Sequence, residues 1–142
     1  MQKKDISTAR RNRIFKTLTE ALSKRDEIIF AYVHGSFLEG VLFNDIDVAL
    51  YIKETEVSRE KESGYCDDLS LDLSGRIGFT ADVHIMNHAP VGFQHGVFKH
   101  GRLLFSKDDE LRSDLIEETS METMLFYEHS LEYIRDIVYH GH

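Results

Sequence analysis

Cysteine, long apolar runs and positive charge are all scarce in this chain of 142 residues. Cys66 is the only cysteine, so the chain can form neither an intrachain disulfide nor a zinc site built from several thiolates. No apolar run approaches the roughly 20 residues of a membrane-spanning helix, and the first five residues lack the apolar centre of a signal peptide. We therefore expect a cytoplasmic protein.

The shortage of positive charge restricts the partners of the chain. There are 17 lysines and arginines against 25 aspartates and glutamates, which gives a net charge of -8. Broad nucleic-acid binding draws on many lysine and arginine contacts to phosphates, so we do not expect direct nucleic-acid binding. A nucleotide carried by a metal ion remains compatible with this charge, because the cation supplies local positive charge. The length fits one domain spanning residues 1–142.

The residues that carry chemistry are concentrated between Gly35 and Leu50. A Gly35-Ser36 pair is followed, after a spacer, by Asp45 and Asp47. Side chains alternate along a strand, so both carboxylates would share one face. Paired carboxylates repel each other unless a cation neutralises them, and Mg²⁺ suits such hard oxygen ligands. The alternative for this segment is a solvated strand edge without a metal.

Gly35 and Ser36 are candidates for nucleotide binding. A glycine lets the backbone approach a ligand closely, and the free N–H groups of the segment that Ser36 begins suit a phosphate oxygen. Further along, residues 80–86 alternate like a half-buried strand, with Asp82 and His84 on one face. Asp82 is therefore a third candidate carboxylate, the alternative being an exposed strand aspartate. His84 and His88 lie four residues apart but not on a helix, so they match no metal-binding histidine motif.

Hydrophobic periodicity predicts an α/β protein. The expected helices cover residues 7–24, a segment through Cys66 that ends near Gly75 or Gly78, residues 91–99, and a long final segment from residue 107 with an interruption near Thr119 and Ser120. The expected strands cover residues 28–33, 45–52, 80–86 and 102–106, the first two being neighbours. We expect a small mixed sheet with helices on one face and the carboxylates on an open edge of the other.

The spacing of the polar residues resembles that of a known superfamily. Gly35-Ser36, an eight-residue spacer and the run Asp45-Ile46-Asp47-Val48 resemble the signature of DNA polymerase beta-type nucleotidyltransferases. The short length and residues 31–37 resemble the minimal nucleotidyltransferases, the MNT half of HEPN/MNT toxin–antitoxin pairs. Asn87, Ala89 and Pro90, which follow Asp82, match the same minimal members.

The resemblance implies a fold, a chemistry and a partner. It implies the polymerase beta-like nucleotidyltransferase fold, with two Mg²⁺ ions held by Asp45, Asp47 and Asp82 and with Gly35 and Ser36 holding the phosphates of ATP. The implied reaction transfers AMP from ATP to a tyrosine of a partner HEPN ribonuclease toxin, so that the chain acts as an antitoxin.

Two departures from the pattern keep another reading open. The spacer between Ser36 and Asp45 is about two residues shorter than in many members, and Glu39 stands in a segment where a basic residue is frequent. Both favour the alternative of a noncatalytic antitoxin that neutralises its toxin by binding alone. A metal-dependent hydrolase of phosphodiesters is a third reading, which lacks an accompanying His-Asp metal motif.

Overall fold

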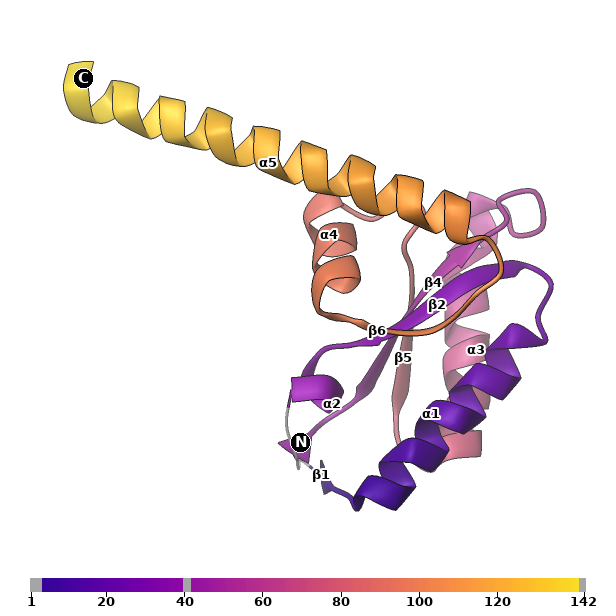
Figure 1. Ribbon diagram of the computed structural model, residues 1–142. Helices are drawn as coiled ribbons and strands as arrows, with labels where there is room; N and C mark the ends of the chain where they lie inside the picture. The colour runs from indigo at the N-terminus through magenta and orange to yellow at the C-terminus, as the bar shows by residue number, and fades with distance from the viewer. Residues whose placement is uncertain (1–3, 40–41, 141–142) are drawn as a thin grey trace.

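The computed structural model describes residues 4–39 and 42–140 and shows alternating helices and strands (Figure 1). In chain order the elements are β1 (Lys4–Asp5), α1 (Thr8–Ser23), β2 (Ile28–His34), α2 (Ser36–Glu39), β3 (Leu42–Phe43), β4 (Ile46–Ile52), the 3₁₀ helix η1 (Arg59–Lys61), α3 (Glu62–Ile77), β5 (Ala81–Ile85), α4 (Val91–His100), β6 (Arg102–Ser106) and α5 (Asp109–His140).

The central sheet has the strand order β5-β4-β2-β6. β2 runs antiparallel to both β4 and β6, whereas β4 runs parallel to β5. The short strands β1 and β3, which the periodicity does not predict, form a separate two-stranded ladder. The predicted mixed sheet is confirmed, and so is the predicted pairing of the first two long strands.

Helices cover both faces of this sheet, so the expectation of helices on one face only is wrong. On one face, α1 and α3 bury Leu18 and Leu73 against Val48. On the other face, α4 packs Val97 against Phe30 and Ala49, together with Leu115 from the start of α5. Most residues of β2 and β4 are buried. Strands that are apolar on both faces need a cover on each side, which explains the second helical layer.

The last helix, α5, continues without a break from Asp109 to His140, so the predicted interruption near Thr119 and Ser120 is wrong. The Thr119 hydroxyl donates to the carbonyl of Ile116 and the Thr123 hydroxyl donates to the carbonyl of Thr119, so both are satisfied inside the helix. The C-terminal half of α5 extends away from the body of the molecule (Figure 1). None of the described helices is long and apolar enough to cross a membrane.

Three residues of α3 close the outer edge of the sheet. The Ser74 hydroxyl accepts from the N–H of Ala81 at 2.9 Å, and the Ser70 hydroxyl accepts from the N–H of Val83 at 3.0 Å. One helical turn earlier, the sulfur of Cys66 faces the N–H of Ile85. Burial and nearby carboxylates raise the pKa of Cys66 to about 11, so the thiol stays protonated at neutral pH. The outward N–H groups of β5 are thereby occupied within the molecule.

Asn87 continues the pairing of the sheet beyond the end of β5. Its side-chain oxygen accepts from the N–H of Ile52 at 3.0 Å, and its amide nitrogen donates to the carbonyl of Ile52 at 2.8 Å. The side chain therefore satisfies both backbone groups of the last residue of β4. This contact gives a structural reason for an asparagine at a position that the resemblance singles out.

Replacing Asn87 with alanine is expected to lower the free energy of unfolding by about 2 kcal/mol, because two partly buried backbone groups lose their partners. Urea denaturation monitored by circular dichroism measures this change. Asn87→Asp keeps the acceptor but loses the donor, so it should also destabilise. An Asn87→Ala protein as stable as the wild type would show that this contact contributes nothing.

Candidate functional site

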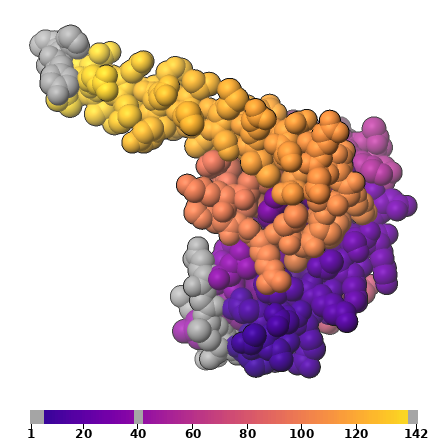
Figure 2. All heavy atoms as spheres, in the orientation of Figure 1, coloured from indigo at the N-terminus to yellow at the C-terminus, as the bar shows by residue number. Residues whose placement is uncertain are grey.

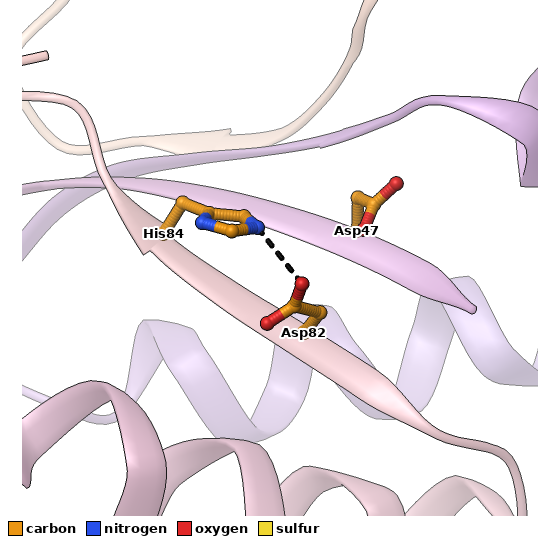
Figure 3. Close-up of side chains that lie close together, drawn as sticks. All are labelled: Asp47, Asp82 and His84. Carbon is orange, nitrogen blue, oxygen red and sulfur yellow. Dashed lines mark hydrogen bonds and ion pairs between the residues drawn. The ribbon is translucent and has the colours of Figure 1, made fainter.

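Two carboxylates lie side by side on the sheet face that α4 covers. Asp47 is the second residue of β4 and Asp82 the second residue of β5, and the parallel register pairs them directly. One oxygen of each carboxylate and one ring nitrogen of His84 lie within 4.8 Å of one another (Figure 3). The pairing of β4 with β5 therefore brings together two predicted site residues that are far apart in the sequence.

The third predicted carboxylate, Asp45, lies immediately before β4 and outside this group of three. Its Oδ1 atom is buried and has no hydrogen-bond partner among the described residues. The charge of Asp45 nevertheless helps to raise the pKa of Asp47, so the two groups interact electrostatically. A buried carboxylate oxygen without a partner is a position where a cation would be stabilised.

His84 is a member of the group that no metal-binding sequence motif indicates. Its Nε2 atom lies 3.0 Å from Oδ2 of Asp82, as the dashed line in Figure 3 marks. Histidine motifs with helical spacing do not include it, because it lies on a strand. The signal that was available is its position two residues after Asp82, which places both side chains on the same face of β5.

His34, at the end of β2, borders the same cluster. Its ring packs edge to face against Phe93 at 5.4 Å between centroids and lies 6.2 Å from the ring of His84. Burial lowers the pKa of His34, and the neighbouring His84 lowers it further, while Asp82 opposes the shift. His34 is therefore a neutral, packed ring that limits the site on one side.

Gly35 lies directly against the carboxylate of Asp47. Its φ is +83°, in the left-handed region that favours glycine. A Cβ atom at this position would lie 2.5 Å from Oδ2 of Asp47, far closer than van der Waals contact allows. Ser36 follows as the first residue of α2. The predicted glycine turn and one predicted carboxylate, Asp47, thus lie against each other.

Helix α2 is held in place from α1. The Arg11 guanidinium donates to the carbonyl of Phe37 and also lies over the Phe37 ring, 4.2 Å from its centroid. Arg10 similarly lies over the ring of Phe79. Arg10 and Arg11 of α1 therefore both have packing roles. The side chain of Glu39 and residues 40–41, where the sequence departs from the superfamily pattern, lie outside the described part of the chain.

A hollow of about 480 Å³ opens beside His84, between the N-terminal turns of α3 and α4. Apolar groups line most of it, among them Ile85, Pro90 and Phe93. Glu62 contributes a buried Oε1 atom that has no hydrogen-bond partner among the described residues. The group formed by Asp47, Asp82 and His84 therefore has an adjacent space large enough for a substrate group.

The residues present fit a divalent cation. Burial raises the pKa of Asp47, and the negative charge of Asp82 raises it further, while His84 opposes the shift. Asp47 and Asp82 offer close hard oxygen donors of the kind that Mg²⁺ prefers, and the unpartnered oxygen of Asp45, outside this group, is a further donor of the same kind. Asp45, Asp47 and Asp82 are the residues that would hold it.

Mg²⁺ is expected to raise the melting temperature of the wild-type protein. At a Mg²⁺ concentration ten times its dissociation constant, binding contributes about 1.4 kcal/mol, which corresponds to a few degrees. Because the folded-state pKa of Asp47 is raised, ionising Asp47 costs stability above its unfolded-state pKa and costs nothing well below it. Without metal at neutral pH, Asp47→Asn should therefore melt higher than the wild type, and Mg²⁺ should not stabilise it further.

Differential scanning fluorimetry with and without Mg²⁺ makes this comparison. Asp68→Asn is the control, since Asp68 is exposed on α3 and outside the cluster. Equal stabilisation of the wild type and of Asp47→Asn by Mg²⁺ would contradict a metal site at Asp47.

Comparison with known proteins connects this geometry to a family. The family described as Polymerase beta, Nucleotidyltransferase matches residues 16–110, about two thirds of the chain. This range includes Gly35, Ser36 and all three predicted carboxylates. No curated protein matches the chain significantly.

Solved structures share the fold at low sequence identity. A tri-AMPylated Shewanella oneidensis HEPN toxin in complex with MNT antitoxin matches with a TM-score of 0.59 and 19% identity, over 94% of this chain and 99% of the other. A toxin–antitoxin structure with AMP-PNP matches with a TM-score of 0.62 and 20% identity, over 90% of this chain and 98% of the other. The toxin–antitoxin MntA-HepT matches with a TM-score of 0.58 and 19% identity, over 93% and 99%.

The solved structures support the fold, and the match over residues 16–110 identifies the family. A mixed sheet that places a glycine turn against paired carboxylates is consistent with both. The chain belongs to the polymerase beta nucleotidyltransferase family.

Proposed function

We propose that the chain transfers AMP from ATP to a tyrosine hydroxyl of a HEPN-type ribonuclease toxin and thereby acts as its antitoxin in the cytoplasm. The observation that carries the proposal is the register of β4 and β5, which sets Asp47 beside Asp82 with Gly35 against Asp47. The AMPylated toxin and the AMP-PNP complex among the similar structures support the choice of nucleotide and acceptor.

In this proposal one group of residues binds the phosphates of ATP and another group binds the metal ions. Gly35 and Ser36, which follow β2 directly, would hold the β- and γ-phosphates. Asp45, Asp47 and Asp82 would hold two Mg²⁺ ions, which neutralise the triphosphate and lower the pKa of the attacking hydroxyl. The hollow beside His84 gives a substrate group access to the cluster.

The reaction balances as a single displacement. The acceptor oxygen forms a bond to the α-phosphorus of ATP while the bond from that phosphorus to the bridging oxygen breaks, and pyrophosphate leaves. Asp82 takes up the proton of the acceptor hydroxyl as general base. The product is an adenylylated tyrosine that carries an added phosphodiester.

The test combines the chain, Mg²⁺, ATP labelled at the α-phosphate and a HEPN-type protein. We expect the label to appear on the HEPN-type protein, and ATP labelled at the γ-phosphate to leave none. Neutralisation of the toxin without any label transfer would favour an antitoxin that acts by binding alone. Cleavage of a labelled nucleic acid by the chain would favour a hydrolase.

A further inference from the structure

The projecting half of α5 stands clear of the other described elements (Figure 2), and its exposed side chains form a broad apolar surface. Ten large apolar side chains between Met121 and Val138 are at least 40% exposed. Exposed apolar surfaces of this extent mark interaction sites in folded proteins. The α5 face is defined here by the residues Met124, Phe126, Tyr127, Leu131, Tyr133, Ile134, Ile137 and Val138.

The α5 face covers about half of the circumference of the helix. At 3.6 residues per turn, its eight residues fall within an arc of about 180°. Only Thr123 and Ser130 interrupt this arc. Their hydroxyls donate to the carbonyls of Thr119 and Phe126, at 2.7 and 2.9 Å, so the hydrogen bonds of both stay inside the helix. A partner therefore needs no polar group opposite them.

The opposite side of the helix is acidic. Between residues 121 and 138 it carries Glu122, Glu128, Glu132 and Asp136 against a single arginine, Arg135. Amphipathic helices that bind membranes usually carry lysine and arginine there, so this helix does not suit an anionic membrane. A second copy would bring another acidic helix and another net charge of -8. Charge complementarity therefore favours a basic protein partner.

We infer that the α5 face docks into an apolar groove between two helices of the HEPN-type partner, with lysines and arginines of that partner at the rim of the groove. An apolar arc about 180° wide exceeds the narrow seam of a two-helix coiled coil, and it fits the helix-in-groove mode of recognition. The choice of this occupant rests on the proposed function. The docking would hold the toxin while its tyrosine reaches the carboxylates.

The test compares two identical substitutions on opposite sides of one helix. Leu131→Glu places a carboxylate in the α5 face, and Leu125→Glu places one on the acidic side. Both leucines are exposed, by 40% and 52% respectively, so neither change disturbs the core. Isothermal titration with the HEPN-type protein should show binding at least about thirtyfold weaker for Leu131→Glu, and within about threefold of wild type for Leu125→Glu.

Equal binding by the two variants would overturn the inference. So would light scattering that shows a wild-type dimer which Leu131→Glu dissociates, since the occupant would then be a second copy. Failure of the proposed function is seen separately, as absence of label transfer by wild-type protein that still binds the toxin. In that case the comparison of the two leucine variants still decides whether the α5 face is the docking surface.

Discussion

Replacing Asp47 with asparagine is expected to reduce AMP transfer at least about a thousandfold. Asp47 is the carboxylate that touches both halves of the site, since it pairs with Asp82 across the sheet and lies against Gly35. Removing a ligand that positions a catalytic metal forfeits several kcal/mol of transition-state stabilisation, and about 4 kcal/mol corresponds to a thousandfold change in rate. Initial rates with α-labelled ATP and the HEPN-type protein measure the effect.

A matched set of variants separates this effect from unfolding. Asp82→Asn should lower the rate to a similar degree, whereas Asp68→Asn, on the exposed side of α3, should leave it within about twofold. All three proteins should remain folded by circular dichroism, and Asp47→Asn should still bind the toxin. Transfer by Asp47→Asn at the wild-type rate would show that the reaction takes place elsewhere.

Replacing Gly35 with alanine is expected to damage stability and activity together. A non-glycine residue in the left-handed region costs about 1–2 kcal/mol. In addition, the new Cβ would lie 2.5 Å from Oδ2 of Asp47, so the carboxylate or the turn has to move. Displacing a reacting group by about 1 Å can cost a hundredfold in rate, and we expect a loss of that order.

Gly75→Ala is the control for this experiment. Gly75 lies in α3, and a Cβ there would have no atom within 4 Å. The change should raise stability by about 0.5 kcal/mol, because alanine favours the helix, and it should leave transfer unchanged. A Gly35→Ala protein with wild-type activity would contradict a tight contact between the turn and Asp47.

The long strands and helices follow from local patterns, but the arrangement of the site does not. Alternation along residues 80–86 places Asp82 and His84 on one face. This alternation does not indicate which strand lies beside β5. Asp47 and Asp82 are paired across β4 and β5, and α3 lies between these two strands in the sequence. The apolar run of β2 likewise indicates burial without specifying that a second helical layer, α4 and the start of α5, supplies it.

Two further differences arise from short or polar segments. β1 and β3 have two residues each, which is too few for any periodicity. Thr119 and Ser120 lie at the point where the sequence predicts a break, and threonine and serine are weak helix formers. The hydroxyl of Thr119 bonds to the backbone of its own helix, and α5 continues through this point.

The contacts of Ser70 and Ser74 of α3 with the backbone of β5 affect how this protein can assemble. Since the N–H groups of Ala81 and Val83 already have partners, the β5 border offers little to a foreign strand seeking backbone pairing. Extension of the sheet from one molecule into the next is therefore disfavoured on that side. Contacts between molecules across this border should therefore use helices rather than strand pairing.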